Sequence, residues 1–361
     1  MESTDEAMVE DAVVEETTVR VNTPPPNKKK HGCGFGCLIT FLIILAGLVI
    51  LGAFSKQLKE RFPDIFESDP QSSAGEDEFP DFEEVWSAGE GDVNVVRIPI
   101  TGMIMLGESS PWIENTTEFA LRAIRRATLD EDISGILLEV DSGGGGVTAS
   151  DIIYHALKQF KAAKEGRVVV AIMGDTAASG AYYISLAADY IIAHPTTITG
   201  SIGVIMQSYN VSQLAEKLGV SDVTVKSGNN KDLLNAFQPV SNAHKEIIQE
   251  TVNAMYERFA GLVAENRKLP LSKVKQIADG RIFTSEQAKA NGLIDEIGYI
   301  EDAYSKLAEL LDEKSVCIYR YKERENFLSF FKRPKYGLST ELQNLLKERG
   351  PQLQYRWNPG L

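Results

Sequence analysis

The 361-residue chain is poor in cysteine, histidine and positive charge, and each shortage excludes a class of protein. Its three cysteines are too few for a disulfide framework. Its four histidines stand without a Cys-x-x-Cys pair and form no zinc motif, so we expect neither a metal nor a cofactor. The net charge of the chain is −14, whereas proteins that bind nucleic acids carry basic patches that neutralise phosphates. This charge therefore argues against a nucleic-acid partner.

Charge is also missing from one long stretch near the N-terminus. Residues 32–55 contain no charged side chain and match the length of a bilayer core. A cleavable signal peptide would begin closer to the N-terminus, and a buried core helix would not follow a lysine run and a polar tail. We therefore predict one transmembrane helix over 32–55, preceded by a disordered tail over 1–31. Basic residues flank both ends, so charge favours a cytoplasmic N-terminus only slightly.

The sequence after residue 55 predicts a linker, a folded domain and a C-terminal extension. Residues 56–92 are rich in acidic residues and predict an acidic linker. In residues 93–312 strands alternate with helices, which predicts an α/β domain with a mainly parallel sheet. Residues 313–361 form a C-terminal extension to which we assign no role. The predicted strands are 94–100, 133–140, 167–173 and 190–193, and the predicted helices are 114–128, 149–163, one from 181, 243–266, 272–278, 285–291 and 301–311.

Ser179 stands in a turn of small residues between a predicted strand and a predicted helix. The first N–H groups of a helix have no acceptor within it, and they favour negative charge that develops nearby. This corner therefore suits a nucleophile. Taken alone, the position is more typical of a serine whose side chain caps the helix.

A run of four glycines, Gly143–Gly146, also joins a predicted strand to a helix. It lacks the Gly-x-Gly-x-x-Gly and Gly-Lys-Ser/Thr signatures, so it does not predict a nucleotide site. Glycines let a backbone N–H approach a ligand closely, which suits an oxyanion hole or a groove where an extended peptide pairs as a strand. The alternative is a flexible turn.

A nucleophilic serine needs a base, and the histidines are poorly placed for that role. A lysine can serve instead if burial lowers the pKa of its ammonium group towards neutrality. Lys231 and Lys226 are both candidates, and the local sequence does not choose between them.

Several segments together resemble the short form of the signal peptide peptidases, membrane-anchored Ser–Lys proteases related to the Clp protease and crotonase fold. The resemblance covers about Val95–Gly298. Where the family usually carries proline, this chain has Gly143, and where it usually carries a second glycine after the serine, this chain has Ala181. The segments that carry the resemblance are 141–147, 177–184, 187–189, 199–205, 226–232, 277–281 and 292–298.

The resemblance implies an α/β fold of repeated β-α-β units with a Clp protease/crotonase-like arrangement. It also implies a serine endopeptidase that degrades cleaved signal peptides or other small membrane-associated peptides. The implied roles are nucleophile for Ser179, general base for Lys231, support of the lysine for Ser201, and oxyanion donors for the N–H groups of Gly180 and of Gly145 or Gly144.

The resemblance further implies a homo-oligomeric ring in which neighbouring subunits share each active site. Its catalytic domain would stand on the extracytoplasmic side of the cytoplasmic membrane, held by a single-pass anchor. Two alternatives stay open: a catalytically inactive membrane scaffold or regulator with the same fold, and a crotonase-like acyl-CoA enzyme. The membrane anchor and the Ser/Lys pair disfavour the second alternative.

Overall fold

The computed structural model describes residues 80–107, 116–323 and 353–356. The tail predicted over 1–31 and the transmembrane helix predicted over 32–55 lie outside these residues, as does most of the linker predicted over 56–92. Within the described ranges, no helix combines the length and the apolar character needed to cross a bilayer.

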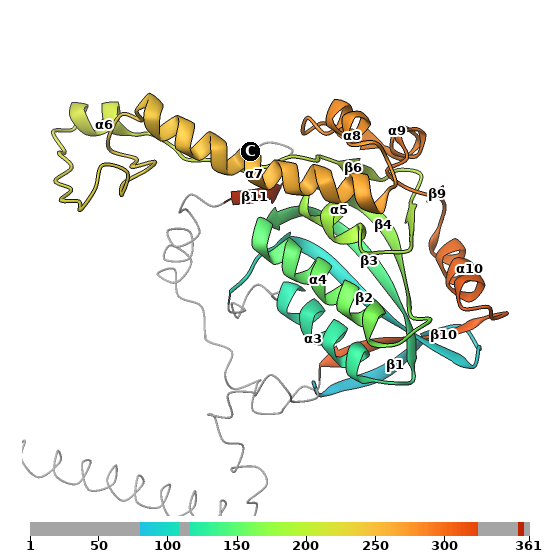
Figure 1. Cartoon of the computed structure of the whole chain (residues 1–361). Coiled ribbons are helices and arrows are strands. Elements are labelled where there is room, and N and C mark those ends of the chain that lie inside the picture. The colour runs from blue at the N-terminus through green and yellow to red at the C-terminus, as the bar shows by residue number, and fades with distance from the viewer. Residues whose placement is uncertain (1–79, 108–115, 324–352, 357–361) are drawn as a thin grey trace, which may run out of the picture. The chain divides into compact units, whose positions relative to one another are not determined.

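Eleven strands of the described residues form one sheet whose neighbours run mostly parallel (Figure 1). The central order is β1-β10-β2-β3-β4-β5-β9, and β6, β7, β8 and β11 extend it beside β3 and β4. The predicted α/β class with a mainly parallel sheet is confirmed. The strands are β1 Phe82–Ala88, β2 Val93–Ile104, β3 Ile133–Gly146, β4 Val168–Ala178, β5 Tyr190–Ala193, β6 Ile198–Gly200, β7 Ile205–Met206, β8 Ile282–Thr284, β9 Glu296–Ile297, β10 Val316–Glu323 and β11 Leu353–Arg356.

Helices cover both faces of the sheet, which explains the continuous apolar runs of its central strands. Alternate residues of β2, β3 and β4 point into two separate hydrophobic cores. One core includes side chains of α3, α4, α5 and α7, and the other includes side chains of α10. The helices are α3 Thr116–Leu129, α4 Val147–Ala163, α5 Gly180–Ser185, α6 Ser212–Lys217, α7 Asn242–Asn266, α8 Leu271–Ile277, α9 Ser285–Asn291 and α10 Ile300–Leu310.

The folded unit extends past the boundaries predicted at 93 and 312. Strand β1, within the segment assigned to the linker, pairs antiparallel with β10, which lies in the segment assigned to the extension. Strand β10 in turn pairs parallel with β2. The ring of Phe82 is buried and stacks on Tyr321 with centroids 5.2 Å apart. The sequence prediction missed strand β1 because the exposed acidic residues around Phe82 give this segment the composition of a linker.

The glycine run predicted as a loop is the end of strand β3. Met103 of β2 lies opposite Gly144, and Ile104 lies opposite Gly145. A Cβ atom on Gly145 would stand 2.0 Å from the carbonyl oxygen of Ile104, so only glycine fits at this position. Gly144 has a φ of 96°, a conformation that glycine adopts without steric cost. The register of β2 against β3 shifts between Thr101 and Met103, and the absence of side chains lets the two strands pair closely beyond that shift.

We expect Gly145→Ala to lower the free energy of unfolding by about 1 to 3 kcal/mol, because its Cβ must push the backbone of Ile104 away. Gly146→Ala is the matched control, since its Cβ would meet the Cβ of Ala149 at 3.7 Å, an ordinary contact. Chemical denaturation of both variants measures the difference. Equal stabilities would contradict the close approach of β2 to β3.

Candidate active site

Ser179 occupies the corner between β4 and α5, and its backbone is strained. Its φ and ψ are 57° and −117°, a combination that costs a serine about 1 to 3 kcal/mol. Two hydrogen bonds hold the corner: the Ser179 N–H donates to the carbonyl of Gly200 at 2.8 Å, and the N–H of Tyr183 donates to the carbonyl of Ser179 at 2.9 Å. The neighbouring strand and helix therefore impose this conformation.

The hydroxyl of Ser179 is buried and makes no hydrogen bond within the described residues. The residue is 1% exposed, and among the described residues its Oγ has no hydrogen-bond partner. The side chain makes no cap hydrogen bond to α5, so the helix-cap interpretation of this serine is wrong. A buried hydroxyl without a partner is costly in a purely structural role.

Ser201 and Gly180 meet Ser179 at the same corner. Ala178 of β4 lies opposite Gly200 of β6 in a parallel pair, so Ser179 and Ser201 each follow the paired residues by one position. Ser201 is 7% exposed with a φ of 49°, and its N–H donates to the carbonyl of Arg281 at 2.8 Å. Gly180 is the first residue of α5, where a backbone N–H has no acceptor within the helix.

The glycine end of β3 lies beside this corner, and Ser142 shapes it. Ser142 is opposite Ala177 of β4. Its hydroxyl donates to the carbonyl of Gly102 at 2.5 Å and accepts from the N–H of Gly144 at 3.0 Å. The N–H of Gly144 is therefore engaged within the chain. The sequence prediction missed Ser142 as a positioning residue, although its place directly before four glycines was a usable signal.

A partly exposed polar network fixes α5 behind the corner. The hydroxyl of Tyr183 donates to the carboxylate of Asp151 at 2.5 Å, and the guanidinium of Arg258 donates to the same oxygen at 2.6 Å. Burial opposes ionisation of Asp151, but these two hydrogen bonds outweigh burial and hold the pKa of its carboxyl below the usual value. Because the three residues belong to α5, α4 and α7, the network ties these helices together.

Lys231 is not brought to Ser179 within one chain. It is exposed on the segment between α6 and α7, and Figure 1 shows that segment projecting past the sheet. The ammonium group of Lys226 binds the carboxylate of Asp232 at 2.7 Å, whereas Lys231 makes no ion pair within the described part of the chain. The ion pair with Asp232 therefore engages Lys226, whereas the amine of Lys231 is left to contact another group.

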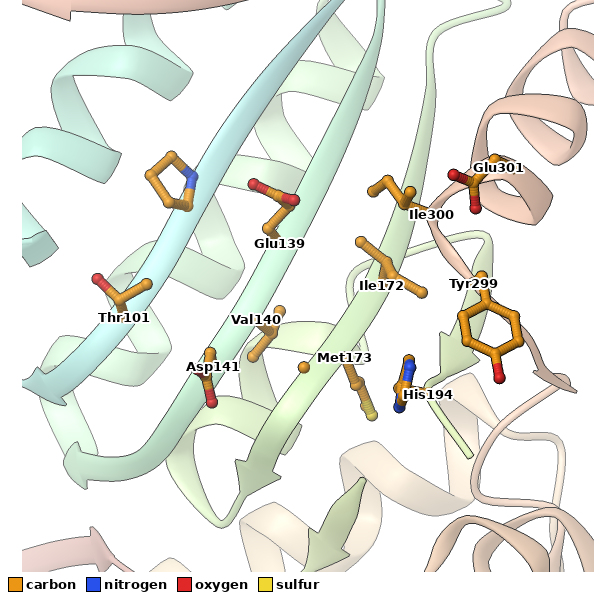
Figure 2. A pocket seen from close by; sticks show the side chains of 12 residues that line it. Thr101, Glu139, Val140, Asp141, Ile172, Met173, His194, Tyr299, Ile300 and Glu301 are labelled. Carbon is orange, nitrogen blue, oxygen red and sulfur yellow. The ribbon is translucent and has the colours of Figure 1, made fainter. Parts of the chain in front are cut away.

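His194 lies away from the Ser179 corner. His194 lines a cavity of about 420 Å³ on the sheet face that α10 covers, together with Glu139 and Asp141 (Figure 2). Its Nδ1 lies 2.8 Å from the hydroxyl of Thr196, and its ring meets Tyr299 edge-on with centroids 4.8 Å apart. None of the predicted site residues lines this cavity. No cluster of three metal-ligating side chains occurs among the described residues.

Comparison with known proteins finds a matching family profile and several relatives that are named as proteases. The profile described as Peptidase family S49 matches residues 161–314, which include Ser179, Ser201 and Lys231. The chain is 39% identical over 244 residues to a protein of Enterococcus faecium named signal peptide peptidase SppA, covering 66% of this chain and 70% of the relative. It is 37% identical to Protease 4 of Salmonella typhi, covering 63% of this chain but 36% of that one.

Among solved structures, a ClpP1 variant of Listeria monocytogenes superimposes with a TM-score of 0.38 and 19% sequence identity. The alignment covers 57% of this chain and 93% of that chain.

We expect Ser142→Ala to loosen the glycine end of β3, because it leaves the N–H of Gly144 and the carbonyl of Gly102 without their partner. Losing such a bond costs about 1 to 3 kcal/mol and should speed amide exchange at Gly144 by roughly tenfold. Ser150→Ala is the matched control, since the buried Ser150 hydroxyl only donates to the carbonyl of Gly146 one helical turn earlier. Hydrogen exchange that is equally slow in both variants would contradict the role of Ser142.

Proposed function

Because the chain belongs to peptidase family S49 and is a serine peptidase, we propose that it is an endopeptidase with a Ser179–Lys231 dyad. The observation that carries this assignment is the state of Ser179. Its backbone is strained and its hydroxyl is buried without a partner, between the start of α5 and the glycine end of β3. Strain and unsatisfied polar atoms of this kind are retained where chemistry requires them.

In the proposed reaction, neutral Lys231 accepts the proton of Ser179 as Oγ attacks the carbonyl carbon of a peptide. The carbonyl oxygen becomes an oxyanion that accepts hydrogen bonds from the N–H groups of Gly180 and Gly145. Collapse of the intermediate breaks the C–N bond, and the lysine protonates the departing amine. Water then hydrolyses the acyl-enzyme by the same steps. Gly145 is preferred to Gly144 because the N–H of Gly144 already binds Ser142.

We place Ser201 beside the base. Its position next to Ser179 suits a hydroxyl that hydrogen-bonds the lysine amine and orients its lone pair towards Oγ. In this arrangement the amine N–H donates to the hydroxyl of Ser201, and burial of the corner favours the deprotonated amine because it disfavours a charged ammonium group.

We propose that Lys231 reaches Ser179 from a neighbouring copy of the chain. Within the described residues of one chain, Ser179 has no base, and the segment that carries Lys231 presents apolar side chains to solvent. Val223 and Val225 are 88% and 96% exposed, and Tyr209 and Leu218 are 65% and 69% exposed. Exposed apolar groups gathered on one segment mark an interaction surface. A head-to-tail contact that repeats between copies forms a ring when the rotation between the copies closes.

The proposed substrates are cleaved signal peptides or other small peptides associated with the membrane. Two observations support this class: the name of the relative from Enterococcus faecium, and the apolar segment 32–55, which we propose as a single-pass anchor. An anchored catalytic domain on the extracytoplasmic side of the cytoplasmic membrane would meet such peptides at a raised effective concentration.

We expect Ser179→Ala and Lys231→Ala each to reduce peptide hydrolysis by at least about 10³-fold, because each removes a group that takes part in bond cleavage. Lys226→Ala is the matched control and should retain activity within about threefold, since its exposed ion pair contributes little. Hydrolysis of a fluorogenic peptide by the purified full chain, with size-exclusion chromatography of each variant, provides the measurement. Full activity of Lys231→Ala would exclude the dyad. A well-assembled parent chain without hydrolysis would favour the scaffold alternative.

Mixing the two inactive variants tests whether the site is shared. If Ser179 and Lys231 of one site belong to different copies, co-assembled Ser179→Ala and Lys231→Ala chains regain about a quarter of the parental sites. A site built within one chain regains none. Activity is measured after co-expression of two differently tagged chains and tandem purification. An inactive mixture containing both tags would place the dyad within a single copy.

A further inference from the structure

Helix α7 connects the core of the domain to the segment that bears Lys231 (Figure 1). All buried residues of α7 lie within 259–263, in its C-terminal half, which packs into the core beside α5. The N-terminal half has no buried residue and follows directly on the Lys231 segment. The Nε2 of His244, in the first turn of α7, lies 3.2 Å from the carbonyl oxygen of Asn229. The half of α7 outside the core therefore carries the Lys231 segment.

The packed half of α7 meets α5 through Tyr183, whose ring lies 5.1 Å from that of Phe259 between centroids. The hydroxyl of Tyr183 accepts from Nε of Arg258 at 3.2 Å and donates to the carboxylate of Asp151 at 2.5 Å. Burial, and then the bond to Asp151, raise the pKa of the Tyr183 phenol, so it stays a donor at neutral pH. Because Arg258 also donates to Asp151 at 2.6 Å, one side chain of α7 engages both α4 and α5.

Tyr183 also belongs to the corner that bears Ser179. Its N–H donates to the carbonyl of Ser179 at 2.9 Å. One residue of α5 thus holds the backbone of the nucleophile through its main chain and holds α7 through its side chain. The direction of α7 is therefore set against the same residue that fixes the Ser179 corner.

Small changes in the direction of α7 are magnified at its far end. From Arg258 to His244 the helix extends about 21 Å, at 1.5 Å per residue. A tilt of about 5° at the packed half would move the far end by roughly 2 Å over this length. A displacement of about 1 Å in a reacting group can lower the rate about 10²-fold.

We propose that Tyr183, Arg258 and Asp151 are positioning residues that fix the direction of α7 and so place Lys231 for the neighbouring copy. The role of Lys231 rests on the proposed function, whereas fixation of α7 by the three side chains does not. The network touches neither the peptide nor the reacting atoms. Its loss reduces the fraction of sites in which the base is in place, so it lowers kcat and leaves KM unchanged.

The first test measures the fixation of α7 without turnover, by amide hydrogen exchange in the full chain. Tyr183→Phe and Arg258→Met each remove hydrogen bonds of the network and keep the apolar packing. Each should speed exchange in residues 255–264 at least about threefold. The double variant should change it by less than the two single effects combined, because both substitutions act on one network. Unchanged exchange, or effects that simply combine, would overturn the proposal.

Tyr190→Phe is the matched control for this test. The hydroxyl of Tyr190 on β5 donates to the carboxylate of Glu296 on β9 at 3.1 Å, so the control also removes a bond from a tyrosine to a carboxylate. It should leave exchange in α7 unchanged. Equally fast exchange in Tyr190→Phe would show a general loss of stability and overturn the proposal.

The second test identifies the chain of a shared site that needs the network. In co-assembled Ser179→Ala and Lys231→Ala chains, the first supplies the lysine and the second supplies the serine. Tyr183→Phe in the chain that supplies the lysine should lower kcat at least about tenfold, with KM unchanged. In the chain that supplies the serine it should change kcat less than about threefold, because the two backbone hydrogen bonds of the corner remain. An effect confined to the serine-supplying chain would overturn the proposal.

Failure of this inference differs from failure of the proposed function. If the mixed chains hydrolyse peptide and respond to neither placement of Tyr183→Phe, the positioning role is wrong and the proposed function stands. If only the parent chain is active, Tyr183→Phe in that chain must lower kcat by the same factor, and an unchanged kcat overturns the positioning role. If no chain hydrolyses peptide but exchange in α7 responds as expected, the proposed function fails and fixation of α7 by the network stands.

Discussion

The structure depends on the way in which β4 ends. At Ala178 the strand is still paired with β6, and one residue later the chain turns into α5 through a conformation that serine adopts only at a cost. The carbonyl of Gly200 and the N–H of Tyr183 hold that turn. Because both partners belong to regular elements, the strain is opposed by the packing of the whole sheet and cannot relax locally.

Burial on both faces of the sheet makes this corner rigid. The central strands contribute alternate residues to two cores, so none of them can shift without disturbing both. The Asp151–Tyr183–Arg258 network adds a polar constraint across α4, α5 and α7. A nucleophile placed on such a support keeps its orientation towards the neighbouring N–H groups, which is what preorganised stabilisation of an oxyanion requires.

The turn of β4 has a second consequence. By leaving the sheet, β4 exposes an edge of β3 built from glycine, and an unpaired edge invites another strand. In this structure β11 occupies that edge. The same departure therefore creates both the corner that bears Ser179 and the opening beside it that β11 fills. Lys231, which we propose as the base, lies on a separate segment with exposed apolar side chains.

The sequence by itself determined the order of strands β2 to β5 and of most helices, the mainly parallel sheet and the position of Ser179, because hydrophobic periodicity and turn residues act locally. It left the role of the Ser179 hydroxyl open, and it missed β1 and the strands β6 to β11, whose pairing partners lie elsewhere in the chain. The positioning role of Ser142 depends on a hydrogen bond from its hydroxyl to the carbonyl of Gly102 on the neighbouring strand. Such contacts join residues that only the folded sheet brings together, so tertiary structure alone decided them.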